Sequence, residues 1–243
     1  MIAVVLAAGR GTRMGALTAT TPKPMLPLAG QPILAHILHG LAGAGLEQVV
    51  LVVGYRGECI VEHFGNGRHM GLQLQYVWQE KPEGTAAALL LASGHIGSHP
   101  FFLTWGDVVV SPANYRALCE RFLRQPCAGW IGINAVDDPA AGAAVYLDGE
   151  RVCRMVEKPP PGTSRTRWNN AGLGIYQPLL LDYAAALPPS PRGERELPQA
   201  VQAMIAGGHE VRAYPIRGFW SDLGTPEALA LAERTFDPNA EPE

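Results

Sequence analysis

The sequence predicts an α/β protein with a single domain, in which a mainly parallel mixed sheet is layered between helices. Short apolar runs alternate with segments of helical periodicity through the first half of the chain. The second half changes to closely spaced strands, with a hairpin signal at Asp148-Gly149. Neither an internal repeat nor a linker divides the 243-residue sequence, so residues 1–236 are expected to fold as one domain.

The opening residues show this pattern first. Ile2–Ala7 is an apolar run typical of a buried parallel strand, and it leads straight into a glycine-bearing loop. The loop carries Arg13 and Lys23, ten residues apart, after Gly9 and Gly11. Glycine lets backbone N–H groups come close to an anion and the two cations add charge, so this loop is expected to hold phosphate.

The following elements alternate in the same way. Helical periodicity predicts helices at 32–44, 57–64, 85–96 and 113–123, and apolar or β-branched runs predict strands at 48–53, 72–78 and 100–104. In the second half, strands are expected at 129–135, 143–147, 151–157, 170–176 and 211–216, and helices at 196–206 and 226–234. The polar end of the chain, 237–243, is expected to be disordered.

Composition and charge narrow the class of protein. Apolar residues make up 47% of the sequence and charged residues 17%, which is typical of a globular core. The net charge is −3 and no basic run is present, so neither nucleic acid nor an anionic membrane is an expected partner. The apolar run at the N-terminus is too short for a signal peptide and no run approaches a membrane span, so a cytoplasmic protein is expected.

Cysteine and histidine spacing does not indicate a metal centre. Four scattered cysteines, without a CxxC pair, are expected to be small buried side chains in a reducing compartment: Cys59, Cys119, Cys127 and Cys153. His36 and His39 have helical spacing but no evident third ligand, so they are expected to be ordinary helix positions.

Two common phosphate-binding loops do not fit the opening residues. A dinucleotide-binding loop needs a third glycine, where this chain has Met14. It also needs an acidic residue at the end of a second strand, about twenty residues later, to bind the ribose, and this chain has none there. A P-loop ends in Gly-Lys-Ser/Thr, which is absent here. The loop is therefore expected to be of another type.

The run AAGRGTRM followed by TPKPMLPL resembles the signature of the nucleotidyltransferases that join a sugar 1-phosphate to a nucleoside triphosphate. The family pattern is Gly-x-Gly-Thr-Arg, a gap and Pro-Lys, and it is met by Gly9, Gly11, Thr12, Arg13, Pro22 and Lys23. The resemblance implies a Rossmann-like three-layer α/β/α nucleotidyltransferase fold. It also implies a nucleotide-binding half at about 1–125 and a sugar-phosphate-binding half at about 126–236.

Two aspartates match the metal ligands of that family. Asp107 follows a glycine and an apolar run, where open α/β sheets bind their ligands, and Asp222 lies in the late block WSDLGTP. The resemblance implies that both hold Mg²⁺, which prefers oxygen ligands and retains bound waters. Trp105 stands where many members of the family carry a smaller or polar residue.

The resemblance also implies how the nucleotide is bound. Arg13 is expected to steady the leaving pyrophosphate, and Lys23 to stabilise charge on the α-phosphate. In the block QEKPEGTA, the amide of Gln79 is expected to pair with the base, while Gly84 lets the base or ribose pack on bare backbone. The expected nucleotide-binding residues are Leu6, Ala7, Ala8, Gly9, Gly11, Thr12, Arg13, Lys23, Gln79, Gly84, Thr85 and Asp107.

A second set of matches implies the site of the sugar phosphate. In the block VEKP, Glu157 is expected to contact sugar hydroxyls and Lys158 the sugar phosphate. Asn170 and Gly172 match an Asn-x-Gly pattern, in which the asparagine also contacts the sugar. The attacking phosphate is already ionised, so no nucleophilic side chain is needed, and the sequence contains no GxSxG.

The expected activity is transfer of a nucleotidyl group from an NTP to a sugar 1-phosphate, with release of pyrophosphate. Gln79 favours dTTP or UTP as the nucleotide, while GTP and CTP remain open. The identity of the sugar is also open, and a homo-oligomer is possible on this sequence. One alternative is a cytidylyltransferase for an alcohol phosphate or phosphonate such as phosphocholine, which tends to lack the late WSDLGTP block. Another is a non-catalytic regulatory protein that binds a nucleotide sugar, which usually loses a loop cation or a metal aspartate. The C-terminal β-helix of larger relatives is absent, so a single activity is expected.

Overall fold

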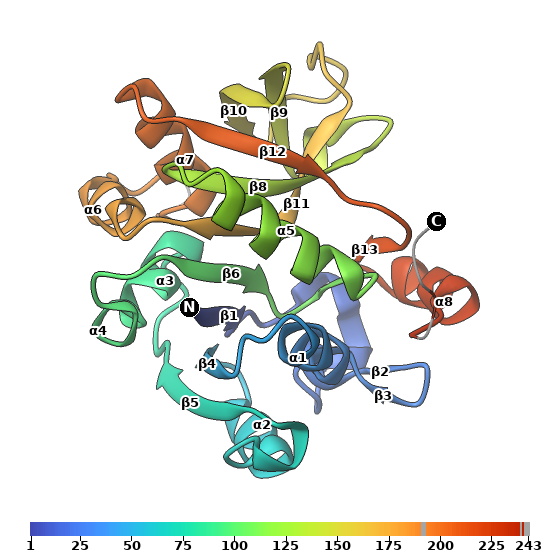
Figure 1. Ribbon diagram of the computed structural model, residues 1–243. Helices are drawn as coiled ribbons and strands as arrows, with labels where there is room; N and C mark the ends of the chain where they lie inside the picture. The colour runs from blue at the N-terminus through green and yellow to red at the C-terminus, as the bar shows by residue number, and fades with distance from the viewer. Residues whose placement is uncertain (191–192, 239, 241–243) are drawn as a thin grey trace.

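A nine-stranded mixed sheet runs through the middle of the protein (Figure 1). The computed structural model describes residues 1–190, 193–238 and 240. In order across the sheet, the strands are β5 (Gln73–Trp78), β4 (Gln48–Val53), β1 (Ile2–Ala7), β6 (Phe101–Trp105), β11 (Trp168–Tyr176), β8 (Gly129–Ala135), β12 (Val211–Pro215), β10 (Arg151–Glu157) and β9 (Ala143–Asp148). Strands β10 and β11 run opposite to the other seven, so the sheet is mixed, as the sequence predicts. The pairings from β5 to β6 are all parallel, whereas those that involve β10 or β11 are antiparallel.

Helices cover both faces of this sheet and complete the three predicted layers. One face packs against α1 (Ile33–Gly43), α2 (Gly57–Phe64), α5 (Ala113–Arg124) and α8 (Pro226–Thr235). The other packs against α3 (Thr85–Leu91), α4 (Ser93–Ile96), α6 (Leu179–Ala186) and α7 (Leu197–Ala206). Alternate residues of β1 enter the two cores: Val5 packs on the α1 side and Val4 on the α3 side. None of the helices in the described ranges is long and apolar enough to span a membrane.

Two small sheets lie beside the main one. Strand β2 (Pro27–Leu28) pairs with β3 (Gln31–Pro32), and β7 (Val108–Val110) pairs antiparallel with β13 (Trp220–Asp222). Short 3₁₀ turns occupy Thr12–Thr18, Lys23–Met25, Arg68–Met70 and Pro139–Ala141. The β7–β13 pair matters most for function, because it joins two segments that are far apart in the sequence.

The predicted elements are present, with a few corrections. The helix predicted at 85–96 is divided at Ala92, just before the Ser-Gly pair of α4, because both residues have low helix propensity. The hairpin turn consists of Gly149 and Glu150, since Asp148 still pairs with Arg151 across the strands. Helix α6 was not expected, because its apolar run shows no clear helical periodicity. The end predicted to be disordered, 237–243, includes 239 and 241–243, which lie outside the described residues.

The cysteines are free, but the prediction that all four are buried is wrong. Cys153 is exposed, because it follows the buried Val152 in β10 and so lies on the opposite face of the strand. The other three are half-buried. His36 lies on α1 with a ring nitrogen 2.8 Å from the Leu28 carbonyl oxygen, as suits a structural position in the helix.

Two glycines of α1 offer a matched test of its packing on α5. A Cβ on Gly40 would collide with the buried ring of Tyr115, whereas a Cβ on Gly43 meets nothing within 4 Å. We expect Gly40→Ala to lower the free energy of unfolding by about 1–3 kcal/mol through overpacking. Gly43→Ala should raise it by up to about 1 kcal/mol, because alanine is the better helix former. Denaturant unfolding checks both values, and equal effects of the two changes would contradict this packing.

Candidate active site

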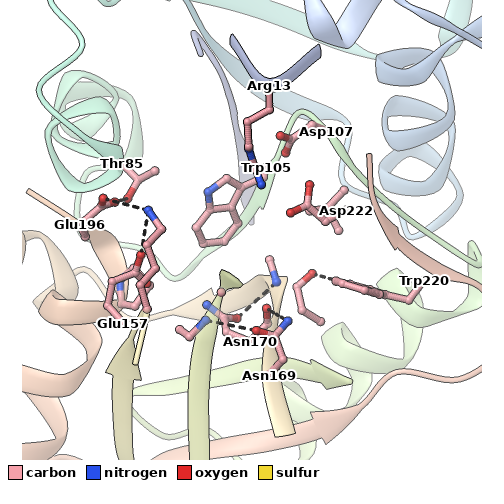
Figure 2. Close-up of a pocket in the computed structure, with 17 residues that line it drawn as sticks. Arg13, Thr85, Trp105, Asp107, Glu157, Asn169, Asn170, Glu196, Trp220 and Asp222 are labelled. Atoms are coloured by element: carbon pink, nitrogen blue, oxygen red, sulfur yellow. Dashed lines mark hydrogen bonds and ion pairs between the residues drawn. The ribbon is translucent and has the colours of Figure 1, made fainter. Parts of the chain in front are cut away.

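Two adjoining cavities open at the carboxyl ends of β1, β5 and β6. The larger cavity, of about 490 Å³, is lined by the loop after β1 and by residues that follow β5 and β6. The smaller cavity, of about 190 Å³, is lined by residues from the end of β10, from β11 and from β13 (Figure 2). Arg13, Thr85, Trp105, Asp107 and Glu196 line both cavities. A molecule in one cavity would therefore lie next to a molecule in the other.

The loop after β1 forms the floor of the larger cavity. Gly11 has a φ of +64°, and a Cβ there would lie 3.1 Å from the Cβ of Lys23, so only glycine fits this turn without strain. The Met14 N–H donates to the Gly11 carbonyl at 2.9 Å and starts the 3₁₀ turn that carries Arg13. All the residues predicted to bind the nucleotide line this cavity: Leu6, Ala7, Ala8, Gly9, Gly11, Thr12, Arg13, Lys23, Gln79, Gly84, Thr85 and Asp107.

The residues predicted for the sugar phosphate line the smaller cavity: Glu157, Lys158, Asn170 and Gly172. Lys158 has a φ of +42°, a left-handed backbone that is unusual for a residue with a side chain. Its N–H donates to the Gly142 carbonyl at 2.7 Å, which holds this conformation. The Asn170 side-chain oxygen accepts from the Gly172 N–H at 3.3 Å. Backbone strain of this kind is often found at functional sites.

Asp107 and Asp222 are brought together by the small β7–β13 sheet. Asp107 immediately precedes β7, and Asp222 pairs with Val108 at the end of β13. The Leu223 N–H donates to the Asp107 carbonyl at 3.0 Å and extends this pairing. The buried ammonium of Lys23 lies 2.5 Å from Asp107 Oδ2 and 3.7 Å from Asp222 Oδ1. Both carboxylates therefore face the same small volume.

The electrostatics of this pair fit a metal ion. Burial raises the pKa of Asp222 above its usual value and the charge of Asp107 raises it further, while Lys23 and Arg13 oppose the shift. A divalent cation would relieve the crowding of two carboxylates. Over the described residues no cluster of three or more histidine, cysteine or acidic side chains occurs, so protein ligands would come from the two aspartates. Two carboxylates plus water and phosphate oxygens is the donor set that Mg²⁺ favours.

Several residues of the site were not predicted from the sequence. Glu196, at the start of α7, is buried and lines both cavities, although its sequence context indicates only a helix start. Asn169 is also buried; its amide nitrogen donates to Asn134 Oδ1 and its oxygen accepts from the Ala143 N–H, both at 3.1 Å. The Trp220 indole donates to the Ala171 carbonyl at 2.9 Å and ties β13 to β11 (Figure 2). The positions of these residues depend on tertiary contacts.

The two adjoining cavities thus have two carboxylates, Asp107 and Asp222, and two cations, Arg13 and Lys23, in their walls. The chain belongs to the nucleotidyl transferase family, whose model matches residues 2–237. The sequence-based predictions of the family, the fold class and a nucleotidyltransferase enzyme are confirmed.

Proteins that are similar to this chain agree with this assignment. A glucose-1-phosphate thymidylyltransferase of Streptomyces griseus is 32% identical over 242 residues, covering 100% of this chain and 68% of that protein. The UTP–glucose-1-phosphate uridylyltransferase AglF of Haloferax volcanii is 34% identical over 237 residues, covering 96% of each. A solved UDP-glucose pyrophosphorylase complexed with UDP-glucose has the same fold, with a TM-score of 0.86 at 22% identity over 96% of this chain and 98% of that one. The relatives' names match the predicted reaction, transfer from an NTP to a sugar 1-phosphate.

Proposed function

We propose that this protein transfers the nucleotidyl group of an NTP to a sugar 1-phosphate, with the nucleotide in the larger cavity and the sugar phosphate in the smaller one. The observation that carries this proposal is the wall that both cavities share, which includes Arg13 and Asp107. In this arrangement the half at about 1–125 binds the nucleotide, and the half at about 126–236 binds the acceptor.

In the proposed reaction, a phosphate oxygen of the sugar 1-phosphate attacks the α-phosphorus of the NTP. The bond from the α-phosphorus to the oxygen that bridges to the β-phosphate breaks, and pyrophosphate leaves with that oxygen. Lys23 stabilises charge on the α-phosphate and Arg13 steadies the pyrophosphate. Lys158 orients the incoming phosphate, while Glu157 and Asn170 bind sugar hydroxyls. The side chains contribute by positioning and by charge, because the attacking oxygen is already ionised.

The proposed cofactor is Mg²⁺, held by Asp107 and Asp222. Its charge would offset the repulsion between two polyanions and polarise the α-phosphate. Support comes from the shared position of the two carboxylates next to Lys23, and from the burial that raises the pKa of Asp222.

For the base we favour a pyrimidine, dTTP or UTP. The Gln79 amide nitrogen donates to the Gly84 carbonyl at 3.3 Å, which orients the amide oxygen as an acceptor for a ring N–H of the base. GTP stays as a competitor, since guanine also carries a ring N–H. CTP stays as one too, because the second N–H of the Gln79 amide could donate to the acceptor nitrogen of the cytosine ring. We further propose the cytoplasm as the location, which agrees with four free cysteines.

Pyrophosphate release tests this function. The protein is incubated with Mg²⁺, each of ATP, CTP, GTP, UTP and dTTP, and a panel of sugar 1-phosphates that also includes phosphocholine. We expect release that requires both substrates and is fastest with UTP or dTTP and one sugar. Release with CTP and phosphocholine would support the alcohol-phosphate alternative. Nucleotide binding without release under any combination would support the regulatory alternative.

A further inference from the structure

Glu196 is a buried acidic side chain at the junction of the two cavities. The residue as a whole is 6% exposed, and carboxylates are rarely buried to this degree unless they are paired. Its two oxygens face partners on opposite sides: Oε2 accepts from the Thr85 hydroxyl at 3.3 Å, and Oε1 lies 3.7 Å from the Lys158 ammonium. Figure 2 shows Glu196 between Thr85, on its helix, and the wall that carries Glu157. One carboxylate thus contacts both the nucleotide side and the acceptor side of the site.

The backbone on either side of Glu196 is fixed to the start of α3. The Leu197 N–H donates to the Thr85 hydroxyl oxygen at 2.8 Å, and the Ala86 N–H donates to the Arg195 carbonyl at 2.9 Å. These bonds attach the backbone around Glu196 to the start of α3, which borders the larger cavity. Its position is therefore set by the nucleotide side of the site.

Lys158 takes its position from this carboxylate and from Glu157. Its ammonium lies 3.4 Å from Glu157 Oε1 and 3.7 Å from Glu196 Oε1. The Lys158 side chain is 43% exposed, whereas those of Glu157 and Glu196 are 11% and 8% exposed. A half-exposed lysine has several accessible rotamers, and the two largely buried carboxylates restrict them.

We propose, building on the function above, that Glu196 is a positioning residue that sets the Lys158 ammonium for the acceptor phosphate. Because Glu196 accepts from the Thr85 hydroxyl, a nucleotide bound in the larger cavity would also affect the position of the Lys158 ammonium. It acts through Lys158, because its Oε1 faces the Lys158 ammonium while its Oε2 accepts from the Thr85 hydroxyl. Loss of the Glu196 carboxylate is therefore expected to misplace the Lys158 ammonium, with less effect on the affinity for the sugar 1-phosphate.

Glu196→Gln separates these effects, because it keeps the size and an acceptor for Thr85 but removes the charge beside Lys158. We expect kcat to fall by about tenfold to a hundredfold, the effect of a misplacement of about 1 Å at a reacting group. The KM for the sugar 1-phosphate should stay the same or fall, because a negative charge has been removed. A residue that binds the sugar directly would instead raise KM at constant kcat.

The link through Thr85 has its own test. Thr85→Val removes the hydroxyl and Thr85→Ser keeps it. We expect the valine variant to lower kcat, and the serine variant to stay near the wild type. In the double variant Thr85→Val with Glu196→Gln, kcat should fall by less than the product of the separate effects, because both changes break one link. Glu210→Gln, an exposed partner of Arg212, serves as the control and should leave kinetics and melting temperature unchanged.

Steady-state kinetics with both substrates varied, together with melting temperatures, decide the proposal. A raised acceptor KM at wild-type kcat, wild-type kinetics, or fully multiplicative effects in the double variant would overturn it. If the wild-type protein showed no turnover, that result would count against the proposed nucleotidyl transfer. Calorimetric binding measurements would then test Glu196 independently of turnover. In calorimetric titrations without metal, NTP should change the affinity for the sugar 1-phosphate in the wild type and not in Glu196→Gln. Equal coupling in both proteins would overturn the proposal.

Discussion

Replacing Asp107 by asparagine is expected to lower kcat by about a hundredfold or more, equivalent to roughly 3 kcal/mol of activation free energy. Asp107 lies on the wall that both cavities share, and Asp222 faces the same volume. Asparagine keeps the shape and one oxygen but removes the negative charge that would hold the metal. The polyanionic substrates would then meet without full charge compensation.

The metal dependence of this variant makes the test specific. Asp107→Asn should need a higher Mg²⁺ concentration for half-maximal turnover than the wild type, with a melting temperature close to that of the wild type. Asp148→Asn, at the exposed end of β9, is the matched control and should change neither value. Wild-type turnover with wild-type metal dependence in Asp107→Asn would refute the role of Asp107.

The second large effect is expected for Lys23→Met. Methionine retains the packing of the buried side chain but removes the ammonium that lies beside both aspartates. Without this charge on the α-phosphate, kcat should fall by about a hundredfold or more. The metal-free protein should also lose about 1–3 kcal/mol of unfolding free energy, because two partly solvated carboxylates are left facing each other.

Addition of Mg²⁺ distinguishes the loss of turnover in Lys23→Met from its loss of stability. A bound cation would replace the lost charge, so Mg²⁺ should restore more of the melting temperature in Lys23→Met than it adds to the wild type. Turnover should stay low, because the ion cannot take the place of the ammonium at the α-phosphate. Arg124→Met removes a cation from the exposed end of α5 and should leave stability and turnover unchanged. Full recovery of turnover at high Mg²⁺ would show that Lys23 acts only on the aspartates.

Local sequence patterns predicted the layers, and the family resemblance predicted many of the residues that line the two cavities. The apolar run of β1 and the glycines after it indicate both a buried strand and a phosphate-binding loop, because each depends on neighbouring residues. The β7–β13 pair could not be predicted in this way. Its strands are three residues each and exist because Val108 meets Asp222 across the fold.

The role of Glu196 shows the same limit within the site. In the sequence it is one acidic residue before a helix, while Lys158 and Thr85 belong to distant segments. Its burial and its contacts with Thr85 and Lys158 arise only when α7 packs against the start of α3 and against β10. Asn169 is similar: the sequence pattern favoured its neighbour Asn170, but the buried contacts to Asn134 and Ala143 belong to Asn169. Residues whose environment comes from tertiary packing leave little local signal.

The most direct measurement is ³¹P nuclear magnetic resonance of the reaction mixture with Mg²⁺ and the best NTP and sugar 1-phosphate pair. If the two cavities hold these substrates side by side, the signals of both should decline together. A diphosphate that joins nucleoside and sugar should appear in equal amount with pyrophosphate, and only when both substrates are present. Consumption of the NTP alone, to a nucleoside mono- or diphosphate with the sugar phosphate untouched, would contradict the proposed transfer.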